Sequence, residues 1–349
     1  MLFKILISNY FIYIFFIIIY IINPVFANEW YGPKEGPIGQ KYKNIIYIAS
    51  DFQNQGVTST YRSFQNASEK LKWNTTIVNG NGDIKQIRKE FFNAVKKHPD
   101  GIILGGFQPD DFFNEVELAK KSKIVLIGWH AAYKPGPTKD LFMNVTTDTK
   151  EVAIMATKYM IEQSKKNVGV IIFNDSYFAI ANEKTKRMLE EIKNCAKCKV
   201  LSVQDISISK ADFEIPIIVP ILVKKYGEKW THTLAINDVY FDNINLPLIK
   251  SKRRDILNIS AGDGSSKAIS RIQSGLSQHI ATIAEPLNIQ GWQMVDELNR
   301  SFSKKNPSRF VTKPILLTKE LLDKFNSIEN IELNTNYQQE YLKIWKIAR

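Results

Sequence analysis

The sequence predicts an α/β protein made of two doubly wound parallel-sheet lobes. From residue 43 onward, short strands rich in β-branched residues alternate with amphipathic helical segments. The strands are continuously apolar, which is typical of a parallel sheet covered by helices on both faces. The alternation runs once before residue 148 and again after it, so each run is expected to form one lobe.

The first run is expected to contain four strands and three helices. The second strand is closed by the turn-forming sequence Asn79-Gly-Asn-Gly82, and Asp83 is placed to cap the next helix. In chain order the expected elements are strand 44–50, helix 57–72, strand 75–78, helix 83–97, strand 101–104, helix 110–121 and strand 124–127.

The second run repeats the pattern, with one unusual helix. Pro216 and Pro220 lie inside it, and each proline removes a backbone donor and clashes with the preceding turn, so we expect this helix to be kinked or partly a loop. After residue 314, a strand, a short helix and a tail with Tyr and Trp are expected to pack across the lobes. The expected elements are helices 148–164, 180–193, 210–226 and 318–325 and strands 168–173, 199–204, 233–236, 255–260 and 280–283.

The first 27 residues predict an export signal. They carry a single charge, Lys4, followed by an apolar run over 10–22 and a small-residue cleavage site that ends at Ala27. The alternative is an uncleaved membrane anchor, which the run over 5–22 could form at about 18 residues. Cleavage after Ala27 would give a soluble periplasmic protein if the source is bacterial.

The formal net charge of +12 raises the question of nucleic-acid binding. The lysines are spread singly and in pairs near predicted helix ends, where they meet the negative end of the helix dipole. The densest cluster is Lys252-Arg253-Arg254. No helix-turn-helix segment precedes the body of the chain, so nucleic acid is not an expected partner, whereas acidic envelope surfaces are possible.

Two strands of the second run stop abruptly at polar residues, at Asn237-Asp238 and at Asp263-Gly264. Ligands of open α/β sheets bind at the carboxyl ends of the strands, so these residues predict a small-molecule site. Asn237 is expected to face the ligand and Asp238 to cap the following helix. Asp263 either contacts the ligand or only caps the next helix.

Four motifs in this order resemble the type I periplasmic binding proteins of the ribose-binding class, and the resemblance covers roughly residues 43–325. They are Leu234-Ala-Ile-Asn-Asp238, Ala261-Gly-Asp-Gly264, the segment 269–275, and Ile280-Ala-Thr-Ile-Ala-Glu-Pro286 followed by Gly291. The resemblance implies two lobes joined by a three-segment hinge, with a ligand cleft between them that closes by hinge motion. It also implies delivery of the ligand to an ABC permease. The N-terminal lobe would comprise 43–146 and 285–313, and the C-terminal lobe 147–284 and 314–349.

The resemblance implies ligand contacts at positions that match the family only in part. Asn237 and Asp263 match the family's amide and carboxylate, and Asn54 aligns with a further asparagine of the site. Glu285 falls where ribose binders usually carry glutamine, His130-Ala131 replaces an Asp-Arg pair, and Asn182 replaces an arginine. The aromatic pair expected after Asn54 is Gly56-Val57. These departures argue against ribose itself.

Several aromatic residues follow strands and could stack on a sugar ring. Phe52, Phe107 and Trp129 belong to the first lobe, and Tyr177 with Phe178 belongs to the second. Trp129 is favoured because Gly128 and His130-Ala-Ala place it in a strand-end loop. The alternative for each of these rings is that it only packs against its own loop. Glu285 precedes Pro286 at a lobe crossing, where it either binds ligand or makes a hinge salt bridge.

The sequence predicts no enzyme, no cofactor and no metal site. The four histidines are scattered, and neither a Gly-x-Ser-x-Gly elbow nor a phosphate-binding loop is present. Asp263 and Glu285 could in principle form the carboxylate pair of a glycosidase. Cys195 and Cys198 are expected to form a disulfide in an exported chain.

The sequence therefore favours a monomeric periplasmic receptor of an ABC importer, which binds a small polar ligand such as a sugar or polyol by hinge closure. The alternative is a periplasmic ligand-binding partner of a sensor histidine kinase in the inner membrane. The export signal and the missing DNA-binding segment disfavour a transcriptional repressor of the same architecture.

Overall fold

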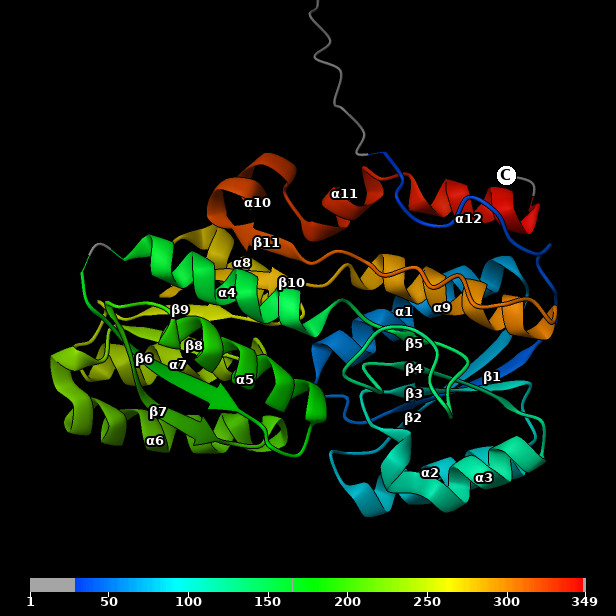
Figure 1. The fold of residues 1–349 in the computed structure, drawn as a ribbon, viewed down its shortest axis with the longest axis horizontal. Helices are drawn as coiled ribbons and strands as arrows, with labels where there is room; N and C mark the ends of the chain where they lie inside the picture. Colours follow the sequence, from blue (N-terminus) through cyan, green and yellow to red (C-terminus); the bar gives the residue numbers. More distant parts are fainter. Residues whose placement is uncertain (1–28, 165, 348–349) are drawn as a thin grey trace, which may run out of the picture.

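The computed structural model describes residues 29–164 and 166–347, which form two lobes side by side (Figure 1). The predicted export signal, residues 1–27, lies outside the described residues. Among the helices of the described part, none has the length and apolar character needed to cross a membrane.

The N-terminal lobe is built on a five-stranded parallel sheet with the order β2-β1-β3-β4-β5. Alternate residues of β1 face opposite sides of it: Tyr47 packs with α1 and α9, whereas Ile48 packs with α2 and α3. The elements are β1 (Asn44–Ala49), α1 (Gln55–Lys70), β2 (Asn74–Asn79), α2 (Ile84–Lys96), β3 (Gly101–Gly105), η1 (Pro109–Phe112), α3 (Phe113–Lys121), β4 (Val125–Trp129), β5 (Asn144–Val145) and, from later in the chain, α9 (Leu287–Phe302).

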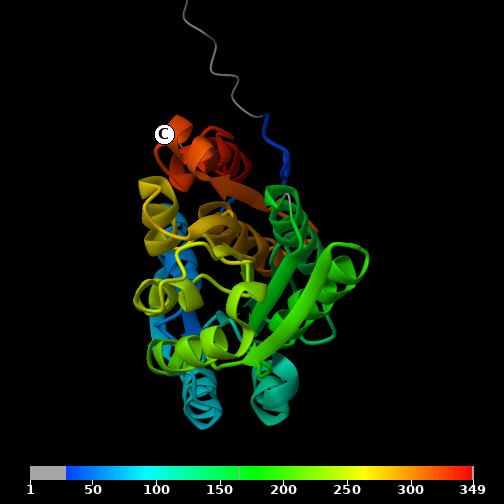
Figure 2. The ribbon, with the colours of Figure 1, turned by 90° about the vertical axis from the view of Figure 1, so that its left-hand side faces the viewer.

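The C-terminal lobe has a six-stranded sheet with the order β11-β10-β9-β8-β6-β7, in which β11 runs antiparallel to β10 and the other pairs are parallel. Helices cover both faces of the sheet (Figure 2). The strands are β6 (Val168–Asn174), β7 (Cys198–Asp205), β8 (His232–Ala235), β9 (Leu257–Ser260), β10 (His279–Ala284) and β11 (Ile315–Thr318). The helices are α4 (Thr149–Gln163), α5 (Ala179–Lys193), η2 (Ile208–Lys210), α6 (Ala211–Tyr226), η3 (Gly227–Lys229), α7 (Val239–Lys250), α8 (Ser266–Ser274), α10 (Lys319–Phe325) and α11 (Ile328–Leu333). The prediction of two doubly wound lobes is confirmed.

Helix α6 is continuous, so the expectation of a partial loop around Pro216 and Pro220 is wrong. Both prolines lie on the exposed side of the helix, while Ile215 and Val219 face the core. The carbonyl groups that lose their partners belong to residues 212 and 216, which are also exposed, and water can bond to them there.

The chain crosses between the lobes three times, at 146–148, at 285–286 and over 303–314. The first crossing joins β5 to α4, the second joins β10 to α9, and the third returns from α9 to β11. This arrangement agrees with the three-segment hinge that the family resemblance implies.

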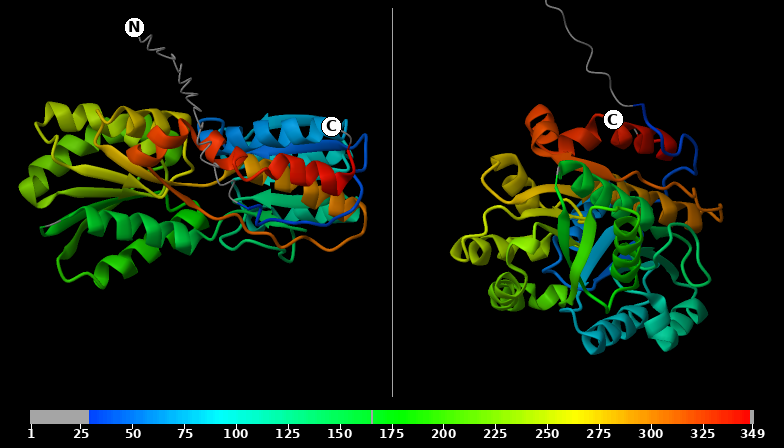
Figure 3. Two further views of the ribbon diagram at one scale, coloured as in Figure 1. Left: turned by 90° about the horizontal axis from the view of Figure 1, so that it is seen from above. Right: turned by 60° about the vertical axis from the view of Figure 1, so that its left-hand side comes forward.

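The C-terminal tail spans both lobes, and this differs from the expected boundary. Helix α10 packs in the C-terminal lobe, but α12 (Tyr337–Trp345) lies over the N-terminal lobe (Figure 3, left). Trp345 of α12 stacks on Trp292 of α9 with ring centroids 5.6 Å apart. Buried aromatic surface therefore draws the last part of 314–349 to the N-terminal lobe.

The expected disulfide is present. Cys195 and Cys198 are bonded to each other in the short connection between α5 and β7. The bond closes a loop of only a few residues, so it stiffens that connection and adds little to global stability.

Candidate functional site

A small cavity of about 40 Å³ lies between the lobes at the carboxyl ends of the strands. Asn237 and Asp263 both line it, so the two residues on which the predicted site depends do converge. The N-terminal lobe contributes Asn54, Gly106 and His130 to the lining, and the C-terminal lobe contributes Phe178, Ile180, Ala181, Lys184, Ile208, Ile236, Asn237 and Asp263.

Asn237 and Asp263 are bonded to each other. The Asn237 Nδ2 donates to Asp263 Oδ2 at 2.9 Å, while its Oδ1 accepts from the backbone N–H of Val239 at 3.0 Å. Burial raises the pKa of Asp263, although the positive charges of Lys184 and His130 oppose that rise. A ligand that donates hydrogen bonds to this carboxylate would therefore replace solvation that it lacks.

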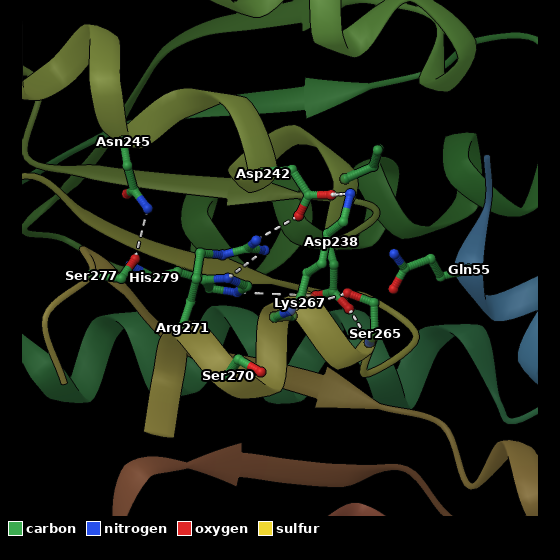
Figure 4. A network of polar contacts seen from close by, with 12 residues as sticks. Gln55, Asp238, Asp242, Asn245, Ser265, Lys267, Ser270, Arg271, Ser277 and His279 are labelled. Carbon is green, nitrogen blue, oxygen red and sulfur yellow. Dashed lines mark hydrogen bonds and ion pairs between the residues drawn. The ribbon is translucent and has the colours of Figure 1, made fainter. Parts of the chain in front are cut away.

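Asp238 does not cap α7, which corrects the expectation from the sequence. Its Oδ2 accepts from the backbone N–H groups of Gly264 and Ser265 at 2.9 and 2.8 Å. Figure 4 shows Asp238 beside Ser265. The Asp238 Oδ1 accepts from the hydroxyls of Ser260 at 2.6 Å and Thr282 at 2.8 Å. Burial would raise the pKa of Asp238, but His279 and these bonds lower it overall. The carboxylate thus anchors the loop that carries Asp263.

The helix cap after this loop is Ser265, whose Oγ accepts from the backbone N–H of Ala268 at 3.2 Å. Asp263 is therefore free of the capping role that its sequence allowed. Its carboxylate lies against the N-terminus of α1 in the other lobe, where a Cβ at Gly56 would come within 2.4 Å of Asp263 Oδ2. Gly56 stands where the family resemblance suggested an aromatic ring, and it gives Asp263 room.

Further contacts join the lobes beside this point. Ser266 Oγ donates to Gln55 Oε1 at 3.2 Å, and Gln55 comes from the N-terminal lobe (Figure 4). Within the N-terminal lobe, Asn54 caps α1 by accepting from the backbone N–H of Gly56 at 3.0 Å. The Ser266–Gln55 bond and the close approach of Asp263 to Gly56 describe a closed cleft.

Lys184 is a pocket residue that the sequence analysis missed. It is 3% exposed, and its Nζ donates to the carbonyl oxygens of Ile236 at 3.3 Å and Ala261 at 2.7 Å. The signal was available, because Lys184 continues the buried stripe of α5 that Ala181 and Met188 define. A lysine on such a stripe needs polar partners at its tip.

Asn182, which was expected in the site, does not line the cavity. Its Oδ1 accepts from Asn174 Nδ2 at 3.0 Å, and its Nδ2 donates to the carbonyl oxygen of Ser176 at 2.8 Å. Its amide is occupied by the loop after β6, so Asn182 shapes that loop instead of meeting a ligand.

His130 and Glu285 form a buried pair at the hinge. His130 Nε2 lies 2.9 Å from Glu285 Oε1, and Glu285 is fully buried and absent from the cavity lining. Burial would raise the pKa of Glu285, but the charge and hydrogen bond of His130, together with Lys184, lower it to about 2. Of the two alternatives for Glu285, these contacts fit the hinge salt bridge.

The ring face of Trp129 that was expected to stack on a ligand is covered by another side chain of the protein. The Trp129 ring is fully buried and stacks on the His130 ring, with centroids 3.9 Å apart and an angle of 6° between the planes. Trp129 is therefore behind His130, outside the cavity lining. The preference for Trp129 as a ligand-stacking ring is wrong because its neighbour covers it.

The other aromatic candidates divide by position. Phe107 packs in the core of the N-terminal lobe, 5.0 Å from Phe112 between ring centroids, so it is not a ligand contact. Phe52 is 41% exposed and lines neither cavity of the cleft. Tyr177 lines only the outer cavity, whereas Phe178 lines both and is the ring best placed for a ligand.

An outer cavity of about 500 Å³ continues the inner one, with which it shares Asn54, Phe178 and Ile208. It is rich in carboxylates from the ends of β1, β6 and β7. Its other lining residues are Ser50, Asp51, Gly82, Asp175, Ser176, Tyr177, Asp205, Ser207, Ser209 and Lys210.

His130, Asp263 and Glu285 are the group among residues 29–164 and 166–347 whose atoms could hold a metal ion, since one ligand atom from each lies within 4.8 Å of the others. Two of these residues already pair with each other, and Asp263 is bonded to Asn237. The charge of Lys184 also acts on both carboxylates. The trio is therefore balanced by the protein's own cations.

The fold and this cleft define a class of two-lobed binding proteins, and comparison with known proteins identifies the family. The periplasmic binding protein domain model matches residues 45–306, so the chain belongs to that family. This confirms the resemblance seen in the sequence. No curated protein sequence matches the chain.

Several solved structures are similar in fold at low sequence identity. The 5-methylthioribose transporter solute-binding protein from Thermotoga lettingae, in complex with 5-methylthioribose, has a TM-score of 0.77 at 13% identity and covers 89% of this chain and 98% of its own. An ABC transporter solute-binding protein from Agrobacterium vitis with bound allitol has a TM-score of 0.72 at 15% identity, covering 82% and 98%. A protein of the same description from Actinobacillus succinogenes with bound D-allose has a TM-score of 0.69 at 15% identity, covering 81% and 100%.

Proposed function

We propose that this protein is the periplasmic solute-binding receptor of an ABC importer and that it binds a small sugar or polyol between its lobes. The observation that carries the proposal is the convergence of polar side chains from both lobes on one buried cavity. Closure of the lobes would be favoured by the ligand because only the closed form makes contacts from both sides.

The chemistry of the cavity fits a ligand with several hydroxyl groups. Asp263 offers acceptor oxygens, Lys184 and the Asn54 amide offer donors, and Phe178 offers an apolar face. A hydroxyl group both donates and accepts, so it can bond to either kind of group. The names of the similar structures, which report allitol, D-allose and 5-methylthioribose as ligands, agree with this class.

The proposed setting is the periplasm, with the export signal cleaved after Ala27 and a monomeric mature chain that delivers ligand to a permease in the inner membrane. The family consists of binding proteins, and we propose binding without turnover. No feature of the described residues favours the alternative partner, a sensor kinase.

The test is a thermal-shift screen of purified residues 28–349 against monosaccharides, polyols and amino sugars, followed by calorimetry on each hit. A ligand at 100 times its dissociation constant stabilises the native state by about 2.7 kcal/mol, which gives a clear shift in Tm. Recovery of unchanged ligand after incubation establishes the absence of turnover. A screen without any shift among these three classes would overturn the proposed ligand class.

A further inference from the structure

The inner cavity is too small to hold a whole ligand of the proposed class. Its volume of about 40 Å³ has room for only a few water molecules, which is less than one sugar ring. The outer cavity has about 500 Å³, within the range of about 300–1,000 Å³ that is typical of small-molecule sites. In the closed cleft the body of a sugar or polyol must therefore lie in the outer cavity, and only one end of it can reach Asp263 and Lys184.

Both lobes line the outer cavity. Asp51 and Gly82 follow β1 and β2 of the N-terminal lobe, while Asp175 and Asp205 lie at the ends of β6 and β7 of the C-terminal lobe. Phe178 lines this cavity and the inner one. One molecule can therefore occupy the two cavities together and touch both lobes in each.

The lining of the outer cavity is acidic, although the chain as a whole is basic. The cavity has the carboxylates of Asp51, Asp175 and Asp205 against the single ammonium group of Lys210, in a chain with a formal net charge of +12. Lys210 is exposed, and it forms no ion pair with any residue of 29–164 or 166–347. A cleft lined by one sign of charge concentrates ions of the opposite sign. The lining thus favours a ligand that carries a positive charge.

Asp51 has a carboxylate oxygen that is free to bind a ligand. The residue is 7% exposed, and its Oδ1 accepts from the backbone N–H of Gln53 at 2.9 Å. No donor reaches its Oδ2 from any residue that the structure describes. Because the side chain has little contact with water, a donor in the cavity would supply the hydrogen bond that Oδ2 lacks.

Asp175 supplies a buried negative charge from the other lobe. It is 3% exposed, and its oxygens accept from the backbone N–H groups of Tyr177 at 3.1 Å and Ile208 at 2.8 Å. These bonds fix the carboxylate, and each oxygen keeps a second acceptor site. Burial raises the pKa of Asp175, the two bonds oppose the rise and the charge of Asp205 adds to it. A cation in the cavity would stabilise the charged form of both carboxylates.

We infer that the outer cavity holds the main part of the ligand and that the ligand is a sugar or polyol with a protonated amino group, which the carboxylates of Asp51 and Asp175 bind from opposite lobes. An ammonium group only donates hydrogen bonds and a carboxylate only accepts them, so the two match more fully than a hydroxyl and a carboxylate do. Tyr177 and Phe178, with ring centroids 5.0 Å apart, offer aromatic surface beside the amine. The inference rests on the proposed function and narrows its ligand class.

The first test compares matched ligands on the mature wild-type protein. Calorimetry is carried out with glucosamine, galactosamine, mannosamine and glucamine, each beside the neutral parent that has a hydroxyl in place of the amine. At least one amine should bind about tenfold more tightly than its parent, because its charged donor meets two carboxylates. Neutral parents that bind as tightly as the amines, or that bind where the amines do not, would overturn the inference and leave the proposed function intact. If nothing in the wider thermal-shift screen binds, the proposed function fails and the inference fails with it.

The second test is Asp51→Asn, measured with the tightest amine and its neutral parent. The substitution removes the charge and keeps an oxygen that can accept from Gln53. It should weaken the amine about tenfold and change the affinity of the parent less than about twofold. Equal losses for the two ligands would mean that Asp51 acts only through the shape of its loop. An unchanged affinity for the amine would mean that Asp51 does not bind it, and either result overturns the inference.

The matched control is Asp100→Asn, which removes the same charge from the same lobe. Asp100 precedes β3, at the edge of the sheet opposite the cleft, and its Oδ2 accepts from the backbone N–H of Asn44 at 2.9 Å. The new amide oxygen can keep that bond, as in Asp51→Asn. Both affinities should stay unchanged. A tenfold loss of amine affinity in this control as well would mean that the net charge of the lobe, and not the outer cavity, selects the amine.

Discussion

The two halves of the cleft are held in place by different means. In the C-terminal half, Asp238 and Asn237 fix Asp263 through bonds that lie entirely within that lobe. In the N-terminal half, the orientation of His130 depends on Glu285, which belongs to the hinge. From this difference we predict that the C-terminal half is formed before closure, whereas the N-terminal half changes with the hinge. We therefore expect a ligand to meet the C-terminal lobe first.

Replacement of Asp238 should have the largest effect, because it removes the anchor of the preformed half. Asp238→Ala leaves two backbone N–H groups and two hydroxyls buried without their partner. A cost of about 3–5 kcal/mol in the free energy of unfolding is typical for breaking such a network. Urea denaturation of the unliganded protein measures it. A loss below about 1 kcal/mol would show that this half is not preorganised by Asp238.

Asp263 should instead matter for the ligand and not for the fold. Asp263→Ala is expected to weaken ligand binding at least 100-fold, about 2.7 kcal/mol, because the ligand loses the carboxylate of the preformed half. The unliganded protein should melt at the same temperature or slightly higher, since burial raises the pKa of Asp263 and the charged form is thus disfavoured in the fold. Calorimetry and thermal melts give the two quantities. Unchanged affinity would remove Asp263 from the site.

The difference between contacts within one lobe and contacts at the hinge also explains what the sequence could and could not predict. The strand and helix pattern, the capping by Asp83 and the convergence of Asn237 with Asp263 follow from local periodicity and from the rule that strand ends meet at one edge. Trp129 is covered by the ring of the next residue, His130, and this stacking depends on side-chain orientations that sequence spacing does not predict. The role of Glu285 depends on His130 and Thr147, which lie more than 100 residues away in the sequence. The placement of α12 on the N-terminal lobe is a long-range choice of the same kind.

A substitution at Gly56 should hinder closure of the lobes, with a smaller effect on ligand affinity. A methyl group at this position would come within 2.4 Å of Asp263 Oδ2 when the lobes are closed. Gly56→Ala should weaken the ligand about tenfold, or 1.4 kcal/mol, because closure is blocked. Alanine suits a helix better than glycine, so the open protein should be at least as stable as the wild type.

Small-angle scattering with and without ligand would follow closure in this variant, and Gln65→Ala, an exposed substitution in the same helix, is the matched control. If Gly56→Ala compacts on ligand addition as the wild type does, the contact between α1 and Asp263 does not limit closure.

The smallest expected effect is a difference between the two lobes in how their stability depends on pH. Burial raises the pKa of Glu297, in the N-terminal lobe, to about 7 and lowers the pKa of His232, in the C-terminal lobe, to about 4. Glu297 holds its proton more tightly in the folded state, so its contribution to stability falls as the pH rises from about 4.5 to 7. His232 resists protonation in the folded state, so its contribution falls as the pH drops from about 6.5 to 4.

Two substitutions test these opposite pH dependences of stability. Glu297→Gln should raise the free energy of unfolding by about 1 kcal/mol at pH 8 and leave it unchanged near pH 4.5, because the neutral amide avoids the cost of ionising a buried group. His232→Gln should do the reverse, with its gain confined to acidic pH. Urea denaturation at the two pH values tests both, and amide hydrogen exchange locates each gain in its lobe. Equal gains at both pH values would mean that packing, and not ionisation, separates these two buried residues.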